Sequence, residues 1–305
     1  MFKNQSGQVR AGWLILLAGI AMFLVQTIFT IPGIILLVMT EAANMVNTST
    51  SDVMATLDEH PWITLFIQGG GTAGGILITL LLWRFVNKMS LKELGIRGSG
   101  KDFGFGLLLG AISITIIFIL LMMTGNVELI NGFSRPEFTA YTLAFAIMFI
   151  LVGFFEEMFF RGYVISTMLS RGNKKWVIYV VSALLFSIVH ATNPNVSMIG
   201  LINIALVGIL FAYMFDVTNS LWLPIGYHMT WNYFQGNVFG FAVSGTTPHG
   251  IYNVSTAVGN KLWTGGAFGL EGGLMATILI LAGFIATNLY AKRKGDIQED
   301  RMLKG

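Results

Sequence analysis

Eight long apolar runs, separated by short polar segments, dominate the chain. Each run holds roughly the 20 apolar residues that a helix needs to cross the hydrocarbon of a bilayer. The pattern therefore predicts an all-α fold, a polytopic membrane helix bundle of about eight transmembrane helices. We expect residues 1–305 to form one transmembrane domain that ends in a short cytoplasmic tail, 292–305. The predicted spans are 11–40, 61–86, 103–124, 139–169, 176–191, 197–215, 221–241 and 273–290.

The composition agrees with a membrane protein. Hydrophobic residues make up 54% of the 305 positions and charged residues only 11%, and the mean hydropathy is +0.72. Because the chain contains no cysteine, a disulfide scaffold and a thiolate metal site or nucleophile are excluded. The basic residues lie beside the apolar runs and not on one face of a soluble domain, so the sequence pI of about 9.1 does not indicate a nucleic acid partner.

Several glycines recur at four-residue spacing within the runs. The pairs Gly70/Gly74, Gly71/Gly75 and Gly106/Gly110 each place two small residues on one face of a helix. Such pairs let neighbouring helices approach closely in a membrane. We expect them to serve helix packing and not phosphate binding.

The distribution of Lys and Arg predicts the orientation in the membrane. Of the 18 such residues, fifteen lie in the segments that are on one side when the spans alternate, and only Arg135 and Lys261 lie on the other; Arg161 is inside a span. By the positive-inside rule both termini are cytoplasmic, and the protein is a multi-pass protein of the cell membrane. Single cysteines at Ser49 and Ser99 are expected to label from opposite sides, Ser49 from outside.

Six polar or charged residues lie within or at the ends of three apolar runs, where lipid makes them costly. They are Glu156, Glu157, Arg161, His190, His228 and Asn232. Glu157 and Arg161 are four residues apart on one helical face and can form an ion pair. Glu156 points about 100° away and is free to act as a general base with a tuned pKa. Such intramembrane groups usually mark a working site.

Each feature alone has a structural explanation. Glu157 and Arg161 could form only a buried ion pair, and a lone intramembrane His or Asn is more often an interhelical hydrogen-bonding group. Six such groups on three helices exceed what packing requires. At a rise of 1.5 Å per residue, Glu156 lies roughly 21 Å and His190 roughly 24 Å from the basic end of their helices, but His228 only about 15 Å. We expect the three segments to converge near mid-membrane, with His228 offset.

The order and spacing of these residues resemble a known family. Glu-Glu-x-x-x-Arg at 156–161, Phe-x-x-x-His at 186–190 and His-x-x-x-Asn at 228–232 are similar to the motifs of the CPBP intramembrane proteases. This Abi or CAAX-protease group includes the Ras-converting CAAX endopeptidase. The resemblance covers a catalytic core of about 145–240 and implies an intramembrane endopeptidase.

The resemblance also implies roles for the residues. Glu156 and His190 would activate the attacking water, His228 and Asn232 would form the oxyanion hole, and Glu157 with Arg161 would orient the site. The expected partners are the lipid bilayer and a hydrophobic, prenylated or membrane-bound peptide or protein substrate. A prenylated CAAX substrate is one candidate, and processing of a peptide toxin or a membrane protein is another.

Metal dependence stays open. The family has been called metalloprotease, and two His with one Glu form a familiar zinc set, which here would be Glu156, His190 and His228. No His-Glu-x-x-His motif is present, and His228 is offset in depth. We therefore favour no cofactor, with Zn²⁺ as the alternative.

Other classes of protein account less well for the pattern. The sequence has no Gly-x-Ser-Gly for a rhomboid serine protease and no Gly-x-Gly-Asp for a presenilin-type aspartyl protease. The alternatives are a non-proteolytic membrane scaffold, a bacteriocin-immunity protein, or a transporter whose intramembrane Glu and His relay protons. A transporter should contain paired half-repeats, and none is evident.

Overall fold

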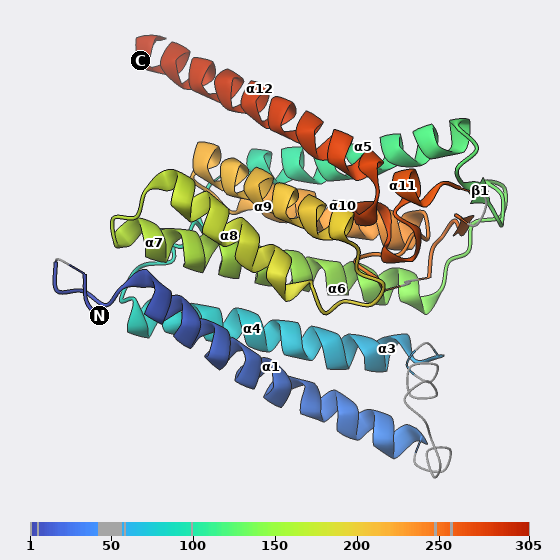
Figure 1. The fold of residues 1–305 in the computed structure, drawn as a ribbon, viewed down its shortest axis with the longest axis horizontal. Helices are drawn as coiled ribbons and strands as arrows, with labels where there is room; N and C mark the ends of the chain where they lie inside the picture. The colour runs from blue at the N-terminus through green and yellow to red at the C-terminus, as the bar shows by residue number, and fades with distance from the viewer. Residues whose placement is uncertain are drawn as a thin grey trace.

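The structure is a computed structural model that describes residues 2–4, 6–41, 57, 59–98, 100–246, 249–256 and 259–304. Ser49 and Ser99, the positions chosen above to test the orientation, lie outside the described residues. The described part is a helical bundle, as the sequence predicts, with one two-stranded sheet, β1 (Glu128–Leu129) with β2 (Val254–Ser255). Figure 1 shows the helices running along the long axis of the molecule.

The longer helices account for all eight predicted spans. They are α1 (Ala11–Glu41), α3 (Pro61–Thr64) with α4 (Gly70–Leu81), α5 (Gly100–Met123), α6 (Ala140–Glu157) with α7 (Ser166–Ser170), α8 (Lys175–Val189), α9 (Met198–Thr218), α10 (Trp222–Tyr233) and α12 (Leu274–Lys304). A short helix, α11 (Lys261–Thr264), and two 3₁₀ turns, η5 (Gly266–Phe268) and η6 (Leu270–Gly272), precede α12.

Four π-helical segments continue these helices without a break. They are η1 (Leu65–Gly69) between α3 and α4, η2 (Leu82–Val86) after α4, η3 (Met158–Ile165) between α6 and α7, and η4 (Phe234–Val238) after α10. Wide turns of this kind are rare and often occur at functional sites. Two of them lie at the predicted site: η3 follows Glu157 and contains Arg161, and η4 begins two residues after Asn232.

Six of the eight helical segments are long and apolar enough to cross a membrane among the residues described. The other two, α8 with 15 residues and α10 with 12, are shorter than the roughly 20 residues of a full span. Pro224 lies in the first turn of α10, where a missing N–H costs no helical hydrogen bond. The chain is therefore a multi-pass membrane protein in which two short helices carry His190 and His228.

Close contact between α5 and α10 fixes the position of His228. A Cβ atom added to Gly106 would lie 2.3 Å from the carbonyl oxygen of Leu223, and one added to Gly110 would lie 2.4 Å from that of Tyr227. From the other side, a Cβ on Gly226 would lie 2.5 Å from the Phe103 carbonyl. Only glycine permits these backbones to touch, so the prediction that the Gly106/Gly110 pair serves helix packing is confirmed.

The two ends of the bundle differ in charge. The N-terminal segment, α7 and the C-terminal part of α12 lie at one end of Figure 1, and β1 and α11 lie at the other. The fifteen basic residues assigned to one side by the alternation of spans belong to segments at the first end, whereas Arg135 and Lys261 belong to the second. Which end faces the cytoplasm stays a prediction from the positive-inside rule.

Candidate active site

The six predicted residues come from three neighbouring stretches of helix. Glu156 and Glu157 form the last turn of α6, and Arg161 lies in η3, which continues it. His190 is the C-cap of α8, and His228 and Asn232 lie on α10. Four of the six line one cavity of about 260 Å³: Glu156, His190, His228 and Asn232. The other two, Glu157 and Arg161, are fully buried behind it.

Glu157 is the centre of a buried charge network. Its Oε1 accepts a hydrogen bond from Nη1 of Arg161 at 3.0 Å, so the predicted ion pair is present. The same oxygen accepts a second hydrogen bond, from Nδ1 of His228 at 2.9 Å. A buried carboxylate is stable only when it is paired and hydrogen-bonded. Glu157 thus links α6 to α10, a contact that the sequence analysis did not predict.

Aromatic rings enclose the Arg161 guanidinium. Its central carbon lies 4.3 Å from the ring centre of Phe186 and 5.0 Å from that of Phe211, and Nη2 donates to the carbonyl of Gly208 at 3.4 Å. A cation over an aromatic face is stabilised most when it is desolvated. Phe186, the first residue of the Phe-x-x-x-His motif, therefore contributes to holding Arg161 as well as to placing His190.

The Glu156 carboxylate has an oxygen without a hydrogen-bond partner among the described residues. Its Oε2 lies 3.7 Å from Nε2 of His228, too far for a hydrogen bond, and it is buried with no hydrogen-bond partner among the described residues. A buried oxygen without a protein partner calls for a water or a ligand. In a cavity that also holds two imidazoles, this oxygen is suited to bind and deprotonate water.

The protonation of His190 follows from one contact. Nδ1 of His190 lies 2.7 Å from the carbonyl oxygen of Phe186, and because a carbonyl only accepts, Nδ1 must carry the proton. Nε2 is then the nitrogen of the neutral ring that can accept a proton. The His190 ring also packs against the Phe186 ring, with 4.9 Å between the two ring centres. His190 is therefore held in the tautomer that a base requires.

The side-chain amide of Asn232 has no hydrogen-bond partner among the described residues. Its side chain is buried at 8% exposure and lines the cavity, yet within the described part of the chain it makes no side-chain hydrogen bond. Thr230, two residues earlier, instead donates across to the carbonyl of Leu107 on α5. The helix is thus anchored by Thr230, which leaves the Asn232 amide free for a ligand.

Comparison with protein families gives a match that covers these motifs. Residues 138–234, about a third of the chain, match the family model described as Type II CAAX prenyl endopeptidase Rce1-like. This stretch of the chain is similar to the CAAX-protease family. The match includes all six predicted site residues and overlaps the expected core of about 145–240. Searches of curated proteins and of solved structures gave no match.

The depth predicted for His228 in this candidate site is wrong. His228 lies level with Glu157 and Glu156, which it contacts. The estimate counted from the turn after α9 as if that turn lay at the membrane surface. Ser220 and Leu221 are instead buried at 0% and 1% exposure, and the backbone N–H of Leu221 donates to the carbonyl of Gly95 at 3.0 Å. Because α10 begins inside the bundle, its residues lie deeper than their count suggests.

The three residues of the alternative zinc set do not form a compact cluster among the described residues. Glu156, His190 and His228 face one cavity, but nowhere in the described residues do three His, Asp or Glu side chains lie close enough together to hold a metal ion. Tetrahedral zinc needs at least three protein ligands at about 2.0–2.2 Å from one point. The depth of His228 no longer bears on this question, and a site without zinc stays a prediction.

A second buried carboxylate, Glu271 of η6, also lines the cavity. Its Oε2 accepts a hydrogen bond from Nε2 of Gln235 at 2.6 Å, and Asn203 donates to its backbone carbonyl at 2.7 Å. Burial raises the pKa of Glu271 to about 7. Sequence analysis missed this residue because it lies in a glycine-rich stretch before the last span; Gln235, three residues after Asn232 on the same helix, was the available signal.

Proposed function

We propose that the protein is an intramembrane endopeptidase that hydrolyses a peptide bond in a membrane-associated or hydrophobic peptide. The observation that carries the proposal is the convergence of unused polar groups on one cavity: the free oxygen of Glu156, the accepting nitrogen of His190 and the free amide of Asn232. The match to a protease family supports the same reaction class. Packing of the bundle accounts for none of these three groups.

In the proposed reaction, water bound in the cavity loses a proton to Glu156, with the accepting nitrogen of His190 as its second contact. The hydroxide adds to the carbonyl carbon of the scissile peptide bond, and the carbonyl oxygen becomes an oxyanion. The amide of Asn232 and Nε2 of His228 donate to that oxyanion. The proton then passes from Glu156 to the leaving nitrogen as the carbon–nitrogen bond breaks.

Glu157 has a specific role in this scheme. Because Nδ1 of His228 donates to Glu157, Nε2 can donate to an oxyanion only when the ring is protonated on both nitrogens. The buried carboxylate of Glu157 favours that imidazolium, as the aspartate of a serine-protease triad favours its own. Arg161 in turn holds Glu157 in place through their ion pair.

The substrate class follows from the surroundings of the site. The cavity lies in a bundle of membrane-spanning helices, so we expect a substrate that is hydrophobic, prenylated or itself inserted in the bilayer. The family match favours a prenylated CAAX-type peptide as the first candidate. Toxin precursors and membrane proteins are the other candidates.

The deciding experiment compares wild type with Glu156→Gln on a library of prenylated and hydrophobic peptides in detergent. We expect loss of at least ~10²-fold in rate, the usual worth of a general base. Glu128→Gln, which changes an exposed glutamate in β1, is the matched control and should cleave like wild type. Identical product profiles for wild type and Glu156→Gln would contradict the proposed base, and no cleavage by wild type of any peptide would favour a scaffold, immunity or transport role.

A further inference from the structure

A groove separate from the polar cavity runs along α1. It consists of two cavities, of about 690 Å³ and 620 Å³, which share Ile15 and Leu16 in their walls and so lie end to end. Each falls within the roughly 300–1,000 Å³ of small-molecule pockets. α1 packs mainly against α4, and its other side, facing η3 and α8, is left to form this groove.

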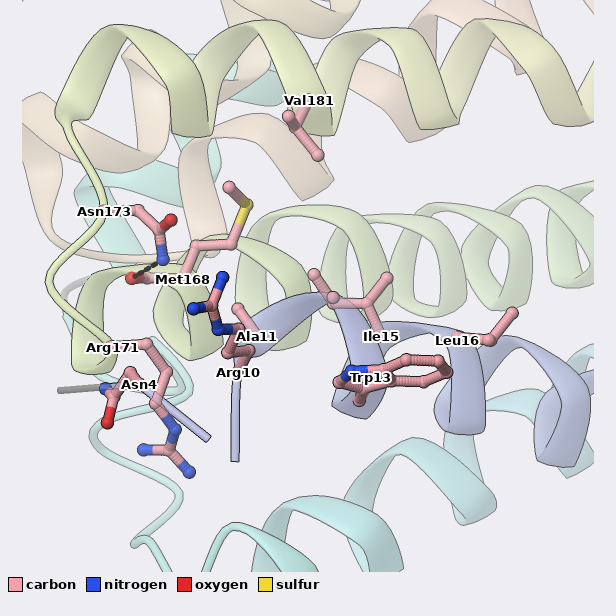
Figure 2. Close-up of a pocket in the computed structure, with 11 residues that line it drawn as sticks. Asn4, Arg10, Ala11, Trp13, Ile15, Leu16, Met168, Arg171, Asn173 and Val181 are labelled. Atoms are coloured by element: carbon pink, nitrogen blue, oxygen red, sulfur yellow. Dashed lines mark hydrogen bonds between the residues drawn. The ribbon is translucent and has the colours of Figure 1, made fainter. Parts of the chain in front are cut away.

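The end of the groove near the chain's N-terminus is polar and basic. Figure 2 shows Asn4, Arg10, Arg171 and Asn173 gathered at this end, with Ile15 and Leu16 farther along α1. Nε of Arg10 donates to the Lys3 carbonyl at 3.1 Å, and Nε of Arg171 donates to the Val9 carbonyl at 2.9 Å. Nη1 of Arg171 also donates to the Ser170 hydroxyl at 3.3 Å. These bonds fix both side chains and leave Nη2 of Arg171 and both terminal nitrogens of Arg10 without a partner among the described residues.

No acidic side chain balances this end. The sequence has no Asp or Glu in 1–40 or in 158–215, the segments that supply its walls. Among the described residues, no carboxylate forms an ion pair with Arg10 or Arg171. Arg10 and Arg171 directly flank the candidate membrane spans that begin at Ala11 and end at Ser170. Two anchored arginines without a counter-charge at such a position are suited to an anionic head group.

The other part of the groove is apolar. Its walls come from Gly19, Ile20 and Phe23 of α1, Phe159 of η3 and Leu185 of α8. Glu156 lies at its far end and also lines the polar cavity. A groove of this kind, open to hydrocarbon along its length, is suited to an acyl chain that continues from a head group at the arginines.

We propose that this groove is a specific binding site for an anionic phospholipid. The phosphate would be bound by Arg10 and Arg171, and one acyl chain would lie along α1 toward Glu156. The chain would then cover the lipid-facing side of Glu156, so that water reaches this residue only through the polar cavity. The charge of the head region and its continuity with the apolar part favour a lipid over a free anion.

The test measures lipid binding directly and so does not depend on peptidase activity. Purified full-length protein is titrated with phosphatidylglycerol and with phosphatidylcholine, and bound lipid is counted by native mass spectrometry. We expect wild type to prefer phosphatidylglycerol. Arg10→Gln and Arg171→Gln should each weaken that preference about fivefold, the effect of one basic residue at an anionic head group. Arg84→Gln, at the same end of the bundle but outside the groove, should bind like wild type.

A second variant tests the acyl part independently. A Cβ on Gly19 would meet no atom within 4 Å, so Gly19→Phe fills the groove without a backbone clash and should release both lipids. Gly104→Phe, on α5 with equally open space, is its control. Wild-type phosphatidylglycerol binding by Arg10→Gln, or by Gly19→Phe, would overturn the site. If inorganic phosphate at equal concentration displaces the lipid, the groove is only an anion site. If a hydrophobic peptide displaces the lipid and phosphate does not, the groove is a substrate site. Either result overturns the proposal.

Discussion

Nδ1 of His228 lies 2.9 Å from Oε1 of Glu157, and the same oxygen lies 3.0 Å from Nη1 of Arg161. One buried carboxylate therefore accepts hydrogen bonds from side chains of two helical segments, η3 and α10. Its neighbour Glu156 has a carboxylate oxygen with no hydrogen bond from the described residues. The two adjacent glutamates differ in their surroundings because they point to different sides of α6. One is part of the interior, and the other faces the cavity.

This difference predicts opposite behaviour for two conservative substitutions. Glu157→Gln leaves Arg161 buried without its counter-charge, and we expect it to lower the free energy of unfolding by about 3–5 kcal/mol. Glu156→Gln removes no hydrogen bond and only a 3.7 Å contact with His228, so it should fold like wild type while losing activity. Thermal denaturation of both variants in the same detergent checks the ranking, and a less stable Glu156→Gln would reverse the assignment.

Asn232 and Asn203 form a second matched pair. Asn232 makes no side-chain hydrogen bond within the described residues, so Asn232→Leu should keep its stability and lose about 10²–10³ in kcat, the worth of one oxyanion donor. Asn203 donates to the carbonyls of Glu271 and Gly273 at 2.7 and 3.0 Å. Asn203→Leu should therefore unfold at a lower temperature. Equal losses of stability in the two variants would assign Asn232 to packing.

The sequence predicted most of the fold because a segment that crosses a bilayer must be helical and needs about 20 mostly apolar residues. It also predicted the Glu157–Arg161 pair, which depends only on helical spacing. It did not predict the Glu157–His228 contact, since those residues lie 71 positions apart and their contact depends on how deeply α10 begins. That depth is set by the buried turn at Ser220 and Leu221, whose burial local sequence does not reveal.

Glu271 predicts a pH dependence of stability. Its pKa in the folded protein is raised to about 7 by burial, so folding favours the protonated form. The stability from this group is fully present below its ordinary pKa and is lost as the pH rises through about 7. Between pH 5 and 8, wild type should lose about 2.5 kcal/mol more than Glu271→Gln. Melting curves of both proteins across this range measure the difference; parallel curves would mean that Glu271 is not the titrating group.

Metal removal tests the proposed chemistry at the site. Because Glu156, His190 and His228 do not form a three-ligand group, we expect protein freed of metal by extensive chelation to cleave at an unchanged rate. Elemental analysis of the same sample confirms removal. Stoichiometric zinc that is lost in step with activity, and that restores activity when added back, would require Glu156 to be a ligand and not a base.

The last prediction concerns the side from which water and substrate enter. The polar cavity is lined by Asn193, Ser244, Thr246 and Glu271, which belong to the loops and turns at the β1 end of the bundle, opposite the basic end. If the basic end is cytoplasmic, the cavity opens to the outside. Single cysteines in this cysteine-free chain can test both statements, with Ser6 at the basic end and Ser134 at the other, each on an exposed residue.

In intact cells, a thiol reagent that does not cross membranes should label Ser134→Cys and leave Ser6→Cys unlabelled until the membrane is opened. Thr246→Cys, at the rim of the cavity, should label from the same side as Ser134→Cys. Labelling of Ser6→Cys from outside would invert the orientation and with it the side of substrate entry. Labelling of Thr246→Cys from the side opposite Ser134 would instead leave the orientation intact and contradict the position of the cavity mouth, because both residues lie at one end of the same bundle.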